Sequence, residues 1–330
     1  MNVFLDTNIF LGFYHFSSDD LRELEKLDAV LMRGDITVDL PKHVEIEFER
    51  NRENRISDAL ARLRKVGARQ EYPQFCKGYA QYGDLRRTQR EFDETLLTLL
   101  TNVEADIADH NLAADRTVRA IMERARTLPC NEVILQQARN RVALGNPPGK
   151  NNSLGDAVIW ECLLSHGTGG DIYFITDDQD YSSAIDRNQF KDVLLREWAE
   201  TQGGHVHYFK TLSGFLRAHF PDIDIESERE KASLIHALLT SSSFVDTHQI
   251  VARLRQFAEF SDQQAISIID AAFLNEQVRW ICTDADVAAF VESVIEGREP
   301  IFDQRKLIMI RVVNQPNDVG DDDEFIDVPF

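Results

Sequence analysis

Short apolar runs separated by amphipathic stretches organise the first two thirds of this chain. Runs that are short, apolar and bounded by turn residues predict strands at residues 2–5, 36–41, 172–176 and 205–211. Apolar positions that recur at helical spacing predict helices over 19–33, 44–66, parts of 84–144, 154–166, 188–198 and 212–219. Because strands and helices alternate, the pattern predicts an α/β fold built on a central parallel sheet.

The pattern changes near residue 222, where Pro221 ends the alternation and a charged connector follows. We predict an N-terminal domain over 1–222, with a helical insertion at 84–145, and a smaller, mostly helical C-terminal domain over 223–316. Residues 317–330 are predicted to form an acidic tail.

The C-terminal part contains two predicted helix caps and one predicted strand. Ser261 with Gln264, and Thr283 with Asp286, have the spacing of helix caps. The apolar run over 306–313 predicts a strand. No internal repeat interrupts this organisation.

Composition describes a globular protein whose charge is unevenly spread. The net charge is −20, from 36 basic and 56 acidic residues. This charge argues against a protein that binds nucleic acid over its whole surface. Residues 50–90 nevertheless hold eleven bases and four acids, whereas 226–330 hold nine bases and 20 acids. Any contact with a polyanion is therefore expected in the N-terminal part.

Other classes of protein are disfavoured by what the chain lacks. No stretch approaches the roughly 20 apolar residues that span a bilayer, and the first residues do not form a signal peptide. The four cysteines are widely spaced, without a CxxC pair, which indicates reduced thiols and not zinc ligands or disulfides. We therefore expect a cytoplasmic protein.

Four acids stand where an apolar run ends or a helix begins: Asp6, Glu47, Asp156 and Asp178. Ligands bind beyond the carboxyl ends of strands in open parallel sheets, where Asp6 and Asp178 are predicted to lie. Carboxylates gathered in one pocket need a cation, and oxygen ligands of this kind suit Mg²⁺ or Mn²⁺. Such a site typically hydrolyses phosphodiesters.

Each acid also has a simpler interpretation. Asp6 is followed by Thr7 and Asn8, and all three residue types are common in turns and helix caps. Glu45 and Glu47 could both be surface acids, and an acid at the position of Asp156 complements a helix dipole. The cluster Asp177, Asp178 and Asp180 is harder to explain without a cation, because its charges repel.

The segments FLDTN, Pro41 to Glu47, GDAVIWE and FITDDQDY, in this order, resemble the four acidic motifs of PIN-domain nucleases. The loop GNPPGKNN before the third acid resembles that of the larger bacterial PIN-like proteins. The resemblance covers about residues 1–220 and implies a three-layer α/β nuclease fold. It also implies that the four acids bind metal for cleavage of RNA, and sometimes of DNA, and it selects Glu47 over Glu45.

The resemblance also implies accessory roles. Asn8 and Thr176 would orient the metal-binding acids through hydrogen bonds, and Asp177 and Asp180 would add acids near the pocket. The stretch between Glu47 and Asp156 is longer than in compact PIN toxins, which indicates inserted helices.

Because an acidic pocket repels a polyanion, flanking cations are needed to hold the substrate. The candidates are Lys150, Arg50, Arg52 and Arg55. The alternative for the three arginines is a solvated helix face.

Three functions remain to be compared. We predict a metal-dependent endoribonuclease of toxin or phage-defence type, with RNA favoured over DNA as its partner. The alternatives are a DNA-directed nuclease and a non-catalytic PIN-like binding or scaffold module. A phosphatase of the haloacid dehalogenase type would need a second Asp where Asn8 stands. The C-terminal domain is expected to bind a partner protein or to mediate self-association.

Overall fold

A computed structural model describes residues 1–15, 21–66, 72–149, 153–305 and 307. The chain divides into two compact units, Met1–Ile225 and Glu226–Phe330. Each unit has its own hydrophobic core.

The first unit is built on a five-stranded, wholly parallel sheet in the order β3-β2-β1-β4-β5. Its strands are β1 (Asn2–Leu5), β2 (Thr37–Pro41), β3 (Arg126–Leu128), β4 (Gly170–Ile175) and β5 (Gly203–Phe209). The predicted α/β fold with a central parallel sheet is confirmed. The central strand β1 pairs with β4 so that Leu5 stands level with Ile175. The residues that follow these two strands therefore meet at one edge of the sheet.

The edge strand β3 was not predicted, because its segment was expected to be helical. It contains only three residues, of which only Leu128 is buried. A strand this short carries too little periodicity to be recognised, and its pairing with β2 decides its conformation.

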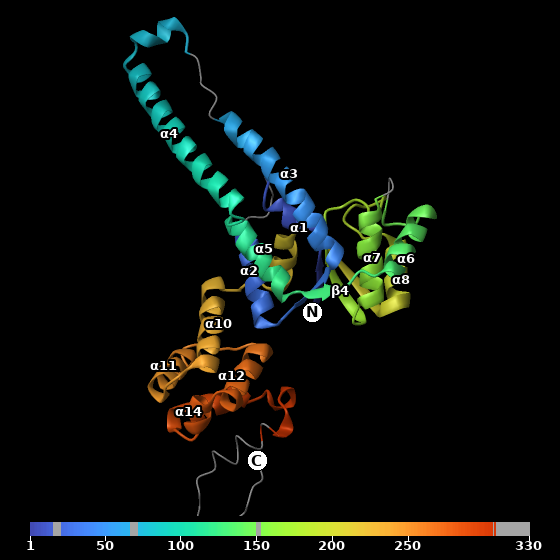
Figure 1. The fold of residues 1–330 in the computed structure, drawn as a ribbon, viewed down its shortest axis with the longest axis vertical. Helices are drawn as coiled ribbons and strands as arrows, with labels where there is room; N and C mark the ends of the chain where they lie inside the picture. The colour runs from blue at the N-terminus through green and yellow to red at the C-terminus, as the bar shows by residue number, and fades with distance from the viewer. Residues whose placement is uncertain (16–20, 67–71, 150–152, 306, 308–330) are drawn as a thin grey trace, which may run out of the picture. The chain divides into compact units, whose positions relative to one another are not determined.

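Helices cover both faces of the sheet, as side chains that alternate along β4 show. Phe174 packs against Trp160 and Tyr181 on one face, and Tyr173 packs against Phe215 on the other. One face carries α6 (Glu132–Ala143), α7 (Leu154–His166) and α8 (Asp192–Gln202), which Figure 1 shows grouped together. The other helices of this layered core are α1 (Thr7–Gly12), α2 (Leu21–Arg33), α5 (Ala113–Arg124) and α9 (Leu212–His219).

Two long helices, α3 (Lys42–Val66) and α4 (Ala80–Ala108), make up much of the stretch between the second and third acids of the first unit (Figure 1). The buried residues of α3 end at Ile56, and among the described residues α4 has no buried side chain. An ion pair between Arg64 and Glu104 at 2.6 Å joins the two helices. The short 3-10 helix η1 (Gln74–Gly78) precedes α4.

The second unit is helical throughout its described part. It contains α10 (Ile225–Thr240), α11 (Phe244–Leu254), α12 (Asp262–Leu274), α13 (Glu276–Trp280), α14 (Ala285–Ile295) and η3 (Glu299–Ile301). None of the helices in the described part of the chain is long and apolar enough to cross a membrane.

The predicted caps in this unit had different outcomes. Ser261 and Gln264 form a reciprocal capping box, as predicted. The prediction for Thr283 was wrong by one residue, because Asp284 is the N-cap of α14. Of the strand predicted over 306–313 only Leu307 is described, and it is helical and buried. The predicted acidic tail, 317–330, lies outside the described residues.

Candidate active site

Asp6 follows the central strand directly and is almost completely buried, with 2% of its surface exposed. Its backbone N–H donates to the carbonyl oxygen of Ile175 at 3.0 Å, which fixes the main chain between two strands. Asp6 occupies the N-cap position of α1, yet its carboxylate makes no capping hydrogen bond. Instead, it accepts a hydrogen bond from the Thr176 hydroxyl at 2.6 Å. The cap interpretation therefore does not explain this side chain.

Thr176 connects Asp6 to the fourth acidic segment. It follows β4, is fully buried, and donates its backbone N–H to the carbonyl of Phe209 at 3.0 Å. Its hydroxyl donates to Asp6 and accepts from the backbone N–H of Asp178 at 2.9 Å. The Asp178 carboxylate in turn accepts from the N–H of Asp180 at 2.7 Å. One hydroxyl thus holds a buried acid and the start of an acidic loop together.

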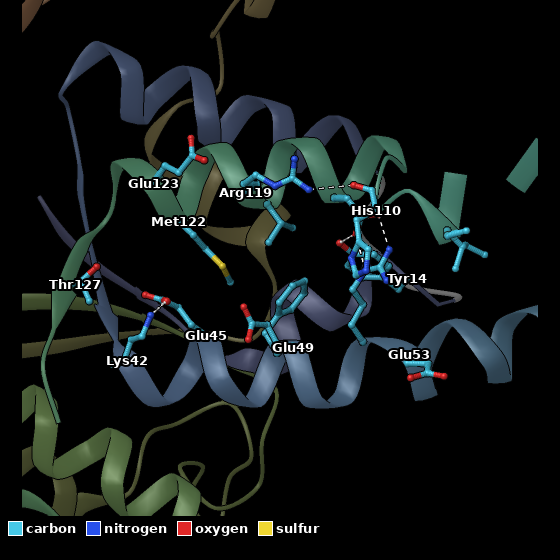
Figure 2. A pocket seen from close by; sticks show the side chains of 16 residues that line it. Tyr14, Lys42, Glu45, Glu49, Glu53, His110, Arg119, Met122, Glu123 and Thr127 are labelled. Carbon is cyan, nitrogen blue, oxygen red and sulfur yellow. Dashed lines mark hydrogen bonds and ion pairs between the residues drawn. The ribbon is translucent and has the colours of Figure 1, made fainter. Parts of the chain in front are cut away.

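Glu47 and Glu45 lie on different sides of α3. The Glu47 carboxylate accepts a hydrogen bond at 3.0 Å from the hydroxyl of Thr7, the residue next to Asp6. Glu45 forms an ion pair with Lys42 and lines a separate pocket of about 880 Å³ beside α5 (Figure 2). The structure thus places Glu47, and not Glu45, beside the segment that contains Asp6.

Asp156 lies in the first turn of α7, where Ser153 donates its hydroxyl to the carboxylate at 2.8 Å. This turn packs tightly against α3. A Cβ atom added to Gly155 would lie 3.2 Å from Nε2 of His43 and 4.0 Å from Oε2 of Glu47. The absence of a side chain at Gly155 allows the third acid to approach the second.

The four acids share one electrostatic environment. Burial raises the pKa of Asp6 to about 7, and the charges of Asp156, Asp178 and Glu47 add to the rise, against the Thr176 hydrogen bond. Burial likewise raises the pKa of Asp156 to about 6, assisted by the charges of Asp178, Glu47 and Asp180. Two buried carboxylates whose pKa values are raised by burial and by neighbouring acids are typical of a functional site.

The donor set fits a hard divalent cation. Its side-chain donors are carboxylate oxygens, which Mg²⁺ and Mn²⁺ prefer, and neutralising them would relieve the cost of burying Asp6. As they stand, no three acidic, histidine or cysteine side chains of the described residues converge closely enough to hold an ion. Binding would therefore require these carboxylates to move closer together.

The accessory residues named from the sequence have different environments. Thr176 makes the contacts described above, and Asp180 accepts from the N–H of Gly149 at 3.3 Å, which ties the acidic loop to the loop before α7. Asp177 is exposed. Asn8 is also exposed, and its side chain makes no hydrogen bond to the four acids in the described part of the chain. The orienting hydroxyl comes from its neighbour Thr7.

Arg141 links α6, α7 and α8 next to the loop that precedes α7. Its buried guanidinium donates to Glu161 at 2.7 Å, to the carbonyl of Pro147 at 2.6 Å, and to Glu197. These bonds join α6, α7 and α8 and hold the loop that reaches Gly149. The loop is thereby positioned beside the acids.

The predicted substrate-binding cations are only partly suited to that role. Arg52 is buried, and its guanidinium forms hydrogen bonds at 2.7 and 2.6 Å with the two carboxylate oxygens of Asp115. The prediction for Arg52 was therefore wrong, because this side chain faces the core and is already paired. Arg50 and Arg55 are exposed on α3. Lys150 lies outside the described residues.

Four residues near the acids were not predicted from the sequence: Thr7, His43, Ser153 and Tyr208. The first three lie within four residues of a predicted acid, so proximity in sequence was an available signal. Tyr208 is 28 residues from Asp180, the nearest predicted acid, and only the pairing of β5 with β4 brings it to the site.

A family model described as a PIN domain matches residues 3–181, a range that includes all four acids. No curated protein and no solved structure matches the chain.

Proposed function

Because the chain belongs to the PIN-domain family, whose members are generally nucleases, we propose that it is a metal-dependent endoribonuclease. Asp6, Glu47, Asp156 and Asp178 would hold Mg²⁺ or Mn²⁺ at the edge of the sheet. The observation that carries this proposal is the burial of the Asp6 carboxylate beside three further acids, with a pKa raised to about 7. A scaffold gains nothing from keeping like charges together at this cost.

The protein's own residues would place and orient the ligands. Thr176, Thr7 and Ser153 each donate a hydroxyl to one of the acids, which fixes the direction of its free oxygen. When bound, the divalent ion would supply Lewis-acid activation of water and stabilisation of the leaving oxygen.

Substrate would be held by cations outside the acidic pocket. Arg50 and Arg55 are exposed on the helix that carries Glu47, and Lys150 stands shortly before Asp156 in the sequence. Phosphate contacts from these residues would offset the repulsion between the acids and a polyanion. RNA is preferred over DNA here because of the resemblance to RNA-cleaving members of the family, and a toxin or phage-defence setting is proposed on the same ground.

One assay tests the proposal. Labelled single-stranded RNA, tRNA and DNA are incubated with the full chain in Mn²⁺ or in EDTA, and the products are separated by size. We expect cleavage of RNA in Mn²⁺ only, and loss of cleavage in Asp6→Asn and Asp156→Asn. Glu45→Gln is the matched control, because Glu45 lies on the other side of α3 and should be dispensable.

The alternatives have distinct results in the same assay. Cleavage of DNA alone would indicate a DNA-directed nuclease. Binding of RNA without cleavage of any substrate would favour the scaffold function. Cleavage that survives both aspartate substitutions would overturn the site.

A further inference from the structure

Tyr208 presents a buried hydroxyl group that has no hydrogen-bond partner among the described residues. It lies near the end of β5, level with Phe174 of the neighbouring strand, and its ring packs against Phe190 with 5.5 Å between centroids. Its hydroxyl oxygen is inaccessible to solvent and has no hydrogen-bond partner in the described part of the chain. Buried polar groups without a partner are rare and destabilising, so each one calls for an explanation.

The surroundings of this hydroxyl are acidic. Burial, and then the charges of Asp177, Asp178 and Asp6, raise the pKa of Tyr208 to about 12. The phenol is therefore protonated at neutral pH, and donation to a nearby carboxylate would give its hydroxyl a partner. The backbone bond from the Thr176 N–H to the carbonyl of Phe209 holds the end of β5 beside the start of the acidic loop.

Of the nearby acids, Asp178 is the most suitable acceptor. Asp177 is exposed to water, and the charge of Asp178 raises the pKa of Tyr208 more than the charge of Asp6 does. Asp178 is half-buried, and the hydrogen bond that its carboxylate accepts from Asp180 goes to Oδ1.

We propose that Tyr208 is a positioning residue of the carboxylate site, which donates its hydroxyl to Asp178 when the acidic loop closes on a divalent cation. This inference rests on the proposed function and adds a residue to it. The orphan hydroxyl would then be a contact kept for the loaded site, in the manner of the outer partners that orient metal ligands.

The test uses Tyr208→Phe, which removes the hydroxyl and keeps the ring that packs on Phe190. Tyr173→Phe is the matched control, because Tyr173 lies on the neighbouring strand but faces the opposite side of the sheet. Mn²⁺ affinity is measured by isothermal titration calorimetry on the full chain, and the melting temperature is measured in EDTA.

We expect Tyr208→Phe to weaken Mn²⁺ binding by about 10-fold or more, the range for outer partners of metal ligands. Its melting temperature in EDTA should be unchanged or higher, because the variant no longer buries an unpaired hydroxyl. Tyr173→Phe should retain wild-type affinity. A merely structural role would instead lower the melting temperature in EDTA and leave affinity unchanged, which would overturn the inference. Equal Mn²⁺ affinity of wild type and Tyr208→Phe would overturn this inference and leave the proposed function standing. A wild type that binds no Mn²⁺ would overturn both.

Discussion

Thr176 donates its hydroxyl to Asp6 at 2.6 Å, although 170 positions separate the two residues in the chain. The same hydroxyl accepts from the N–H of Asp178. We expect Thr176→Val to reduce the free energy of unfolding at neutral pH by about 1–3 kcal/mol, because the buried Asp6 carboxylate and the half-buried N–H of Asp178 lose their partner. Mn²⁺ affinity should fall by about 10-fold or more. Urea unfolding and calorimetry measure the two effects.

Thr176→Ser is the control for this substitution, since it keeps the hydroxyl and should retain most of the affinity. A valine variant that binds Mn²⁺ as tightly as the wild type would show that the hydroxyl does not orient the acids.

The raised pKa values of Asp6 and Asp156 predict how the stability of the protein depends on pH. Folding raises the pKa of Asp6 to about 7 and that of Asp156 to about 6, from an ordinary value of 3.8. The folded protein therefore holds protons that the unfolded chain releases. Their contribution to stability is fully present below about pH 4 and is lost as the pH rises through 6 and 7.

In EDTA, the free energy of unfolding should accordingly fall by on the order of 3 kcal/mol between about pH 5 and about pH 8. Saturating Mn²⁺ should reduce the fall, because a bound cation favours the ionised carboxylates. The double variant Asp6→Asn/Asp156→Asn should show a smaller dependence than the wild type in EDTA. Identical pH profiles for the two proteins would refute this assignment.

Gly155 offers a test that separates the site from the stability of the fold. An added methyl group would lie 3.2 Å from Nε2 of His43, which must shift by a few tenths of an ångström, and 4.0 Å from Oε2 of Glu47, which is an ordinary contact. Alanine is otherwise the better helix former, by up to about 1 kcal/mol. We therefore expect Gly155→Ala to retain or raise the melting temperature and to lower Mn²⁺ affinity and cleavage several-fold. A variant with unchanged Mn²⁺ affinity would show that the spacing between α3 and α7 is not critical.

Three arginines of α3 should behave differently when each is replaced by alanine. Arg52→Ala leaves Asp115 buried without its cation, which should cost about 3–5 kcal/mol of unfolding free energy. Arg50→Ala and Arg55→Ala should keep stability and weaken RNA binding, each reducing the slope of log affinity against log salt by about one. Chemical unfolding and a salt series of RNA binding measure these effects. The prediction fails if the exposed arginines alter stability and Arg52 alone alters binding.

The sequence predicted the elements whose pattern is local. Asp6 and Asp178 were placed correctly at strand ends, because an apolar run followed by an acid can be recognised within ten residues. The strand β3 was not predicted, because three residues are too few to show an alternation of apolar and polar positions. The error at Arg52 has another cause, because the burial of one arginine on a basic helix depends on Asp115, 63 residues further along.

The sequence pattern also did not show which residues of distant segments contact each other. The resemblance implied that Thr176 orients the metal-binding acids, but it did not show that the hydroxyl donates to Asp6 in particular. The resemblance to known motifs selected Glu47 over Glu45, where helical spacing alone left both open. Tyr208 could not be found at all, because its place beside the acids arises from strand pairing.

The pairing of β1 with β4 has a consequence for the protein during its own synthesis. Asp6, Glu47 and Asp156 leave the ribosome early, but the strand that completes the neighbourhood of Asp6 ends at Ile175, and β5 ends only at Phe209. A nascent chain shorter than this carries most of the acids without the sheet edge that gathers them. The geometry thus delays assembly of the site until most of the first unit has been translated.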